Sequence, residues 1–226
     1  MMKSMSTGLG QTDSSSSMNA HYFTAVVLLA WFSLIVLLGQ NGFFIPEAGQ
    51  PPAMLFVTGG VALALFGATY RYHSAFRSYV LNLDMRLLVM LHGTRTLGLG
   101  FVMLYSIGQL PAFFALMAGF GDAITAVWAI AMVYYWITHQ QGLSRKALLR
   151  WNHFGLLDFA LALGIGALSQ TGGLFHIAGG PSNDLVVMMP IVLIPGFLVQ
   201  VLVITHIIIY LQLRNNWKDQ DMIKVD

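Results

Sequence analysis

The sequence contains no cysteine and very little charge, and each absence narrows what the chain can be. Without cysteine, disulfides, thiolate nucleophiles, iron–sulfur clusters and cysteine-ligated zinc are excluded. Charged residues make up 9% of the 226 residues, against about a quarter in a typical soluble domain. Hydrophobic residues make up 57%, and the mean hydropathy is +0.70. This composition predicts a polytopic membrane protein whose outer surface faces lipid.

Several sequence motifs are also missing. The chain has no P-loop and no HExxH pair of zinc ligands. A retinal Schiff base needs a lysine within the membrane, whereas all four lysines lie in tails or loops, at Lys3, Lys146, Lys218 and Lys224. No nucleophile–base pair points to catalysis, so an enzyme is the least supported class. The net charge of +2 comes from basic loops, so no nucleic-acid partner is expected.

Six segments are long and apolar enough to cross the ~30 Å hydrocarbon core, which takes about 20 residues. We therefore predict an all-α membrane protein, a bundle of six transmembrane helices over residues 21–213. The predicted spans are 21–40, 52–70, 87–109, 112–138, 151–170 and 185–213. Residues 1–20 are Ser-rich and polar, which predicts a disordered tail. Residues 214–226 are expected to form a cytoplasmic tail.

Ten of the eleven basic residues fall into four clusters that six spans would place on one face. By the positive-inside rule that face is cytoplasmic, and so are both termini. The loops expected on the opposite face, at 43–50, 109–112 and 171–184, contain no lysine or arginine. Residues 71–86 interleave three arginines with aromatic residues. This pattern predicts an amphipathic segment lying in the membrane interface.

Orientation does not explain the eleventh basic residue, Arg95, which lies inside the third predicted span. Charges at this depth cost at least ~2.5–3.5 kcal/mol and should face partners inside the bundle. At ~1.5 Å per residue, Arg95, Asp158 and His206 lie roughly 10–12 Å from the cytoplasmic ends of their spans. We predict an ion pair between Arg95 and Asp158, with Asp122 as the second candidate. His92 and His206 are expected at its edges.

These five residues leave three functions open. Two carboxylates that share one certain cation leave one carboxylate able to bind a proton, as a proton-linked carrier or small-molecule binding protein requires. Alternatively, His92 and His206 could be the axial ligands of a b-type haem, because they come from different spans at similar depth. No other cofactor or metal is expected. In the third hypothesis the polar layer only joins helices, in an accessory subunit of a larger membrane complex.

Three runs in the second half of the chain resemble segments of small bacterial polytopic membrane proteins that have no assigned function. They are Gly108 to Asp122, Trp151 to Asp158, and Leu193 to His206. The resemblance covers roughly residues 87–213. It implies a multi-pass protein of the bacterial inner membrane, and it brings no activity, ligand or catalytic residue with it. The expected partners are therefore the lipid bilayer, a small ligand or protons, and another membrane protein.

Overall fold

A computed structural model describes residues 9–139 and 143–215, with side chains from residue 19 onward. Over that part the chain is helical, without a strand. The elements are α1 (Leu9–Gln40), α2 (Ala53–Tyr72), α3 (Ser74–Leu81), α4 (Met85–Leu91), η1 (His92–Gly98), α5 (Leu99–Ser106), α6 (Ala112–His139), α7 (Arg145–Leu168), η2 (Asp184–Val187), η3 (Ile194–Leu198) and α8 (Val199–Asn215). The predicted all-α fold is confirmed for these residues.

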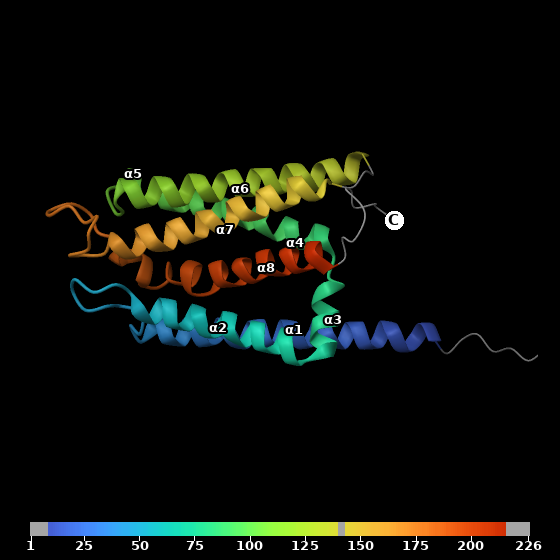
Figure 1. Ribbon diagram of the computed structural model, residues 1–226. Coiled ribbons are helices and arrows are strands. Elements are labelled where there is room, and N and C mark those ends of the chain that lie inside the picture. Colours follow the sequence, from blue (N-terminus) through green and yellow to red (C-terminus); the bar gives the residue numbers. More distant parts are fainter. Residues whose placement is uncertain (1–8, 140–142, 216–226) are drawn as a thin grey trace, which may run out of the picture.

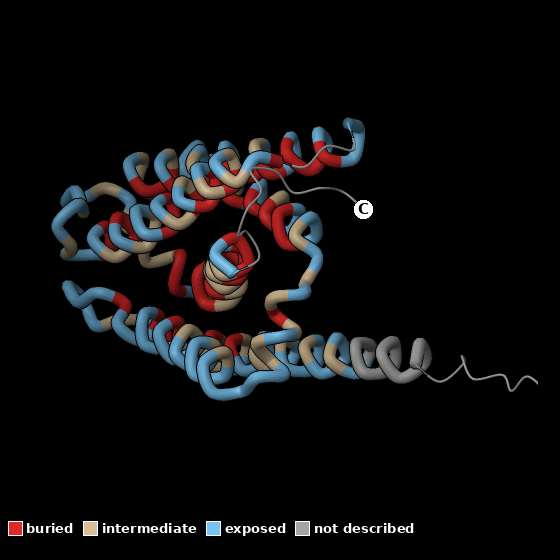
Figure 2. Tube along the Cα trace, turned by 45° about the vertical axis from the view of Figure 1, so that its right-hand side comes forward, coloured by how far each residue is buried: buried red, intermediate tan, exposed pale blue. Residues whose placement is uncertain are grey.

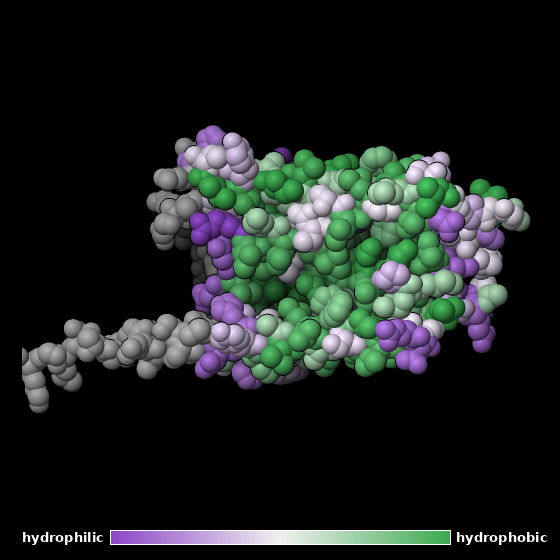
Figure 3. Space-filling view, turned by 180° about the vertical axis from the view of Figure 1, so that it is seen from behind, coloured by the Kyte–Doolittle hydropathy of each residue, from purple (hydrophilic) through white to green (hydrophobic). Residues whose placement is uncertain are grey.

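Six helical stretches of the described chain are long and apolar enough to cross a membrane. They are Asn19–Gln40, Ala53–Tyr72, Met85–Ser106, Ala112–His139, Arg145–Leu168 and Ile194–Asn215. Figure 3 shows apolar side chains over the middle of the molecular surface and hydrophilic ones gathered toward its two ends. A multi-pass membrane protein with six apolar helices, as predicted, accounts for this surface.

Several helix limits differ from the prediction. The sixth helical stretch begins at Ile194 rather than residue 185, because Pro190 and Pro195 each lack a backbone N–H and restrict the residue before them. Helix α7 begins early, at Arg145, since the Ser144 hydroxyl accepts a hydrogen bond from Ala147 N at 3.2 Å and caps it. In the third stretch, residues 92–98 form a 3-10 helix.

The predicted tails are described only in part. Helix α1 begins at Leu9, so residues 9–20, for which we expected disorder, are helical. Residues 1–8 of the predicted N-terminal tail lie outside the described residues, as do residues 216–226 of the predicted C-terminal tail.

Helix α8 occupies the middle of the bundle (Figure 1). It lies between the α1–α2 pair on one side and helices α6 and α7 on the other. Half of its most apolar stretch is buried, whereas the corresponding figure is 11% for α1 and for α2. Figure 2 shows buried positions along the inner faces of α6, α7 and α8 and mostly exposed or intermediate ones on α1 and α2. The core therefore lies around α8.

Helix α3 runs across one end of the bundle, transverse to α1 and α2 (Figure 1). The Gln212 side chain of α8 fixes it there, because Nε2 donates hydrogen bonds to Val80 O at 3.0 Å and to Leu83 O at 2.9 Å. This segment corresponds to the interfacial segment predicted at 71–86, although residues 71–72 end α2 and residues 85–86 begin α4. We call this end of the bundle the basic end and the opposite one the loop end.

Two hydrophobic clusters occupy the two ends of the interior. Toward the basic end, Trp136, Leu148, Trp151, Ile209 and Leu213 belong to one cluster. Toward the loop end, a second cluster includes Phe101, Leu110, Phe114, Ile165 and Val186. Along α6, α7 and α8, the buried ionisable residues fall between these two apolar regions.

Candidate functional site

Arg95 is the centre of a buried ion cluster that joins three helical stretches. Its side chain is buried, and Nε donates to Asp122 Oδ1 of α6 at 2.7 Å. Nη2 forms an ion pair with Asp158 Oδ2 of α7. The predicted contact with Asp158 is present, and Asp122 is a partner at the same time rather than an alternative. A planar guanidinium with five donors can reach both carboxylates. We call these three residues the buried Arg–Asp cluster.

The rest of the guanidinium is enclosed as well. Nη1 lies 3.3 Å from Gly155 O, to which it donates, and 3.2 Å from His206 Nε2. The Phe159 ring lies 3.7 Å from Arg95 Cζ, in cation–π contact. Helices α6, α7 and α8 thus all contribute partners to one cation.

The contacts of His206 determine which of its nitrogens carries the proton. Arginine has no acceptor, so His206 Nε2 must accept from Arg95 Nη1 and is unprotonated. His206 Nδ1 lies 2.8 Å from Asn152 Oδ1, to which it therefore donates. His206 is consequently a neutral imidazole with its proton on Nδ1.

His92 has the opposite arrangement. Its Nε2 lies 3.0 Å from Thr205 Oγ1, and the single hydroxyl proton of Thr205 is already donated to Leu202 O at 2.7 Å. His92 Nε2 must therefore be the donor. Nδ1 has no hydrogen-bond partner among the described residues. A second proton on Nδ1 would make His92 a buried cation without a partner, close to Arg95, so we assign His92 as neutral. Its ring packs edge-on against Trp151.

Glycines provide the space for these side chains. A Cβ at Gly155 would lie 2.5 Å from His206 Nε2 and 3.0 Å from Arg95 Nη1. At Gly98 and Gly121 a Cβ would overlap the side chains of Asp122 and Asp158, respectively. A Cβ at Gly119 would lie 2.9 Å from Gly98 O, so η1 and α6 cross closely there. The glycines thus serve close helix packing, as expected for small residues in membrane helices.

The cluster carries unbalanced charge. Arg95, Asp122 and Asp158 are the only buried side chains with a formal charge in the described part of the chain, since His92 and His206 are neutral. One guanidinium against two ionised carboxylates leaves one negative charge. Such a charge is expensive to hold away from water. The cluster can therefore bind one further positive charge, either a proton or another cation.

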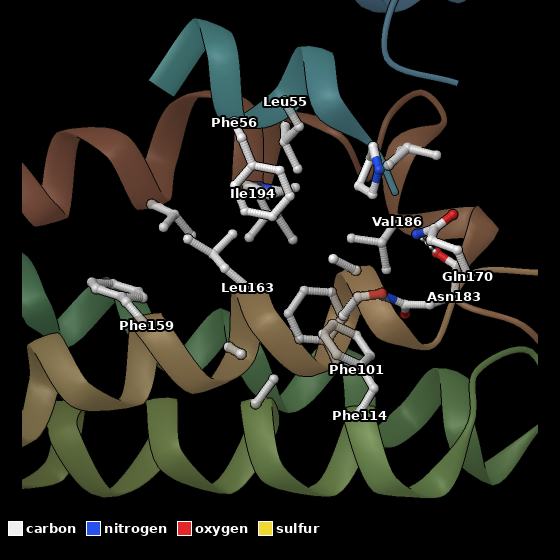
Figure 4. A pocket seen from close by; sticks show the side chains of 18 of the residues that line it. Leu55, Phe56, Phe101, Phe114, Phe159, Leu163, Gln170, Asn183, Val186 and Ile194 are labelled. Carbon is white, nitrogen blue, oxygen red and sulfur yellow. Dashed lines mark hydrogen bonds between the residues drawn. The ribbon is translucent and has the colours of Figure 1, made fainter. Parts of the chain in front are cut away.

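An apolar cavity of ≈ 40 Å³ extends from this cluster toward the loop end. Asp122 lines one end of it, and its side chain keeps 13% of its exposure. Figure 4 shows Phe56 of α2 facing Leu163 and Phe159 of α7, with Gln170 and Asn183 at the end away from Phe159. A cavity of this volume holds about three water molecules.

The two histidines do not fit a b-type haem. Axial ligands bind opposite faces of the porphyrin, with metal–nitrogen bonds of about 2 Å. The rings of His92 and His206 instead contact each other, with centroids 3.9 Å apart and planes tilted by 38°. Both nitrogens of His206 are also engaged in hydrogen bonds. Within the described residues, no group of three or more His, Asp or Glu side chains could hold a metal ion.

All five predicted site residues meet in one layer, but the sequence reasoning missed several others around them. The prediction did not include Asn152, Thr205 and Gly155. Asn152 and Gly155 lie on α7 with Asp158, and Thr205 lies next to His206 on α8. Asn152 and Thr205 could have been recognised as polar residues within predicted membrane spans. Gln170 and Asn183 were assigned to a span end and a loop, and nothing in the local sequence indicates that they are buried.

Comparison with known protein families identifies a matching family. A domain of unknown function (DUF8737) covers residues 51–214, which includes α2 to α7, all of α8 except its last residue, and hence the whole cluster. No curated protein and no solved structure matches the chain.

Proposed function

The chain belongs to the family of the domain of unknown function DUF8737, and from this premise we propose that it is a proton-linked membrane carrier. In this proposal the buried Arg–Asp cluster binds and releases one proton while the protein moves a small molecule across the membrane. The basic end faces the cytoplasm of a bacterial cell, in accordance with the positive-inside rule.

One observation carries this proposal: Arg95 forms ion pairs with both Asp122 and Asp158 at once. A purely structural ion pair needs one carboxylate for one guanidinium. The second carboxylate adds a negative charge that the neutral histidines cannot balance. A proton-coupled site requires a carboxyl group whose protonation state depends on neighbouring groups.

The surroundings of the cluster differ on its two sides. The apolar cavity reaches Asp122 from the loop end. On the other side, the hydrophobic cluster that includes Trp136, Leu148 and Leu213 closes the path to the basic end. Alternating access needs a site near the middle of the membrane that is open to one face at a time.

Charge movement on solid-supported membranes tests the proton step without knowledge of the substrate. Proteoliposomes are adsorbed on the sensor, and a jump from alkaline to neutral pH drives a proton to the buried cluster. We expect a transient current from the wild type and none from Asp122→Asn or Asp158→Asn. Asp84→Asn is the matched control, because Asp84 caps α4 at the exposed basic end and asparagine caps a helix equally well.

The outcomes separate the carrier from an accessory subunit. A current that is absent from the wild type, or equal in all four proteins, would overturn the proton-linked proposal. In that case the cluster only joins helices, as it would in an accessory subunit of a membrane complex.

A further inference from the structure

The residues that line the apolar cavity include hydrogen-bond acceptors at both of its ends. At the loop end, Gln170 Oε1 and Asn183 Oδ1 are buried and lack hydrogen-bond partners among the described residues. Each amide nitrogen of the same side chains uses one of its two N–H groups, since Gln170 Nε2 donates to Asn183 O and Asn183 Nδ2 donates to Gly166 O. At the other end is the carboxylate of Asp122. A ligand that donates hydrogen bonds would therefore satisfy the unpartnered acceptors of this cavity.

The walls between these ends suit a small apolar body. Four phenylalanines line the cavity, at Phe56, Phe101, Phe114 and Phe159. Aromatic faces attract organic cations, and this attraction grows when the cation is desolvated. Phe159 already shows the contact, because its ring stacks on the guanidinium of Arg95.

The charge of a ligand decides which class of hydrogen-bond donor suits the cavity. An anion would add to the excess negative charge of the buried Arg–Asp cluster. A neutral alcohol would satisfy the acceptors but leave that charge unbalanced. An inorganic cation needs several oxygen ligands, which the apolar walls do not provide. An alkylammonium ion brings a positive charge, N–H donors and an apolar body together.

We propose that the apolar cavity binds a small organic ammonium ion, with its charged nitrogen at Asp122. The proposal rests on the carrier function above, because the ammonium ion replaces the proton of the buried Arg–Asp cluster. The exchange balances: one RNH3⁺ enters, and one proton leaves a carboxyl group of the cluster for the solution. Competition of this kind couples proton movement to movement of the amine.

Calorimetric titration of the purified protein with n-butylammonium chloride tests this site. The control ligands are 1-butanol, which has the same chain and no charge, and butyrate, which has the opposite charge. We expect butylammonium to bind at least about tenfold more tightly than 1-butanol, as charge and cation–π contact together imply, and butyrate not to bind. Titrations in two buffers of different ionisation enthalpy should report about one proton released per ammonium ion bound.

Two variants of α7 form a matched pair. Ala167 lines the cavity, whereas Ala160 is exposed on the same helix. Ala167→Phe should fill the cavity and weaken butylammonium binding by about tenfold or more. Ala160→Phe should leave it unchanged.

The results distinguish this proposal from the carrier proposal. Equal affinity for butylammonium and 1-butanol, or unchanged binding to Ala167→Phe, would overturn the ammonium site even if the pH-jump current is present. Selective butylammonium binding without proton release, together with an absent current, would overturn the carrier proposal and leave the cation site standing.

Discussion

Gly121 of α6 lies directly against the carboxylate of Asp158 on α7, and a Cβ at position 121 would overlap Asp158 Oδ1. The same relationship recurs where Gly98 faces Asp122 and where Gly155 faces His206. Asp122, Asp158 and His206 thus each occupy space that a glycine on another helix leaves open. The geometry of the cluster is set by the packing of the helix backbones.

Gly155→Ala should disrupt the cluster, because its methyl group would press on His206 Nε2 and Arg95 Nη1. We expect a loss of about 1–3 kcal/mol in the free energy of unfolding, typical of overpacking. Gly164→Ala on the same helix is the control, since a Cβ there meets nothing within 4 Å. Alanine at 164 should be neutral or stabilise by up to about 1 kcal/mol. Denaturant titration in mild detergent measures both, and equal effects would contradict the packing argument.

Removing the cation of the cluster should cost more stability than removing one of its carboxylates. Arg95→Gln leaves two buried carboxylates without their partner and should cost about 3–5 kcal/mol. Asp158→Asn leaves Arg95 paired with Asp122 at 2.7 Å and removes the excess charge, so a loss of no more than about 1–2 kcal/mol is expected. The same unfolding measurement compares them. If Asp158→Asn were as damaging as Arg95→Gln, both carboxylates would have to be ionised structural partners.

His92 and His206 should be neutral and of opposite tautomers. The hydrogen bonds place the proton of His206 on Nδ1 and that of His92 on Nε2. Nitrogen-15 NMR of histidine-labelled protein distinguishes protonated from unprotonated ring nitrogens. The variants His92→Gln and His206→Gln assign the signals. A fully protonated imidazole at either position at neutral pH would contradict the charge count of the cluster.

Acid should release the loop between α7 and η2. Burial raises the pKa of Asp184, but hydrogen bonds from the hydroxyl and backbone N–H of Thr171 outweigh it and hold the pKa below its usual 3.8. Because the folded pKa is lowered, this stabilisation is present above the ordinary pKa and is lost as pH falls through the lowered value. Hydrogen-exchange protection at Thr171 should fall over that range in the wild type. Asp184→Asn should weaken protection already at neutral pH, whereas Glu47→Gln should behave like the wild type.

The sequence was sufficient to predict the six helices and the layer that holds the site. Helix lengths follow from apolar runs, and depth counting brought Arg95, Asp158 and His206 into one layer. The helix limits near Pro190 and at Ser144 were wrong, because local backbone chemistry, rather than hydropathy, sets where a helix begins. Asp122 was ranked second because depth was counted along straight spans and could not include the reach of the guanidinium.

Other features of the site depend on how the helices rotate against each other. Two histidines at similar depth are compatible with haem ligation as a sequence pattern, but only the packing shows their rings in contact at 3.9 Å. Likewise, Asn183 follows a glycine-rich loop in sequence, and its burial against α7 is a tertiary contact. The rotation of a helix about its axis cannot be predicted reliably from a single apolar sequence.

Carbon-13 NMR of aspartate carboxyl groups, followed as pH is raised, tests the central claim most directly. The claim is that the buried Arg–Asp cluster holds one exchangeable proton between two carboxylates. Asp122→Asn and Asp158→Asn identify the two resonances. The account predicts that at neutral pH the pair carries one proton, seen as one protonated resonance or two intermediate ones, and that alkali removes it. Two carboxylates that stay fully ionised from acidic to alkaline pH would contradict it.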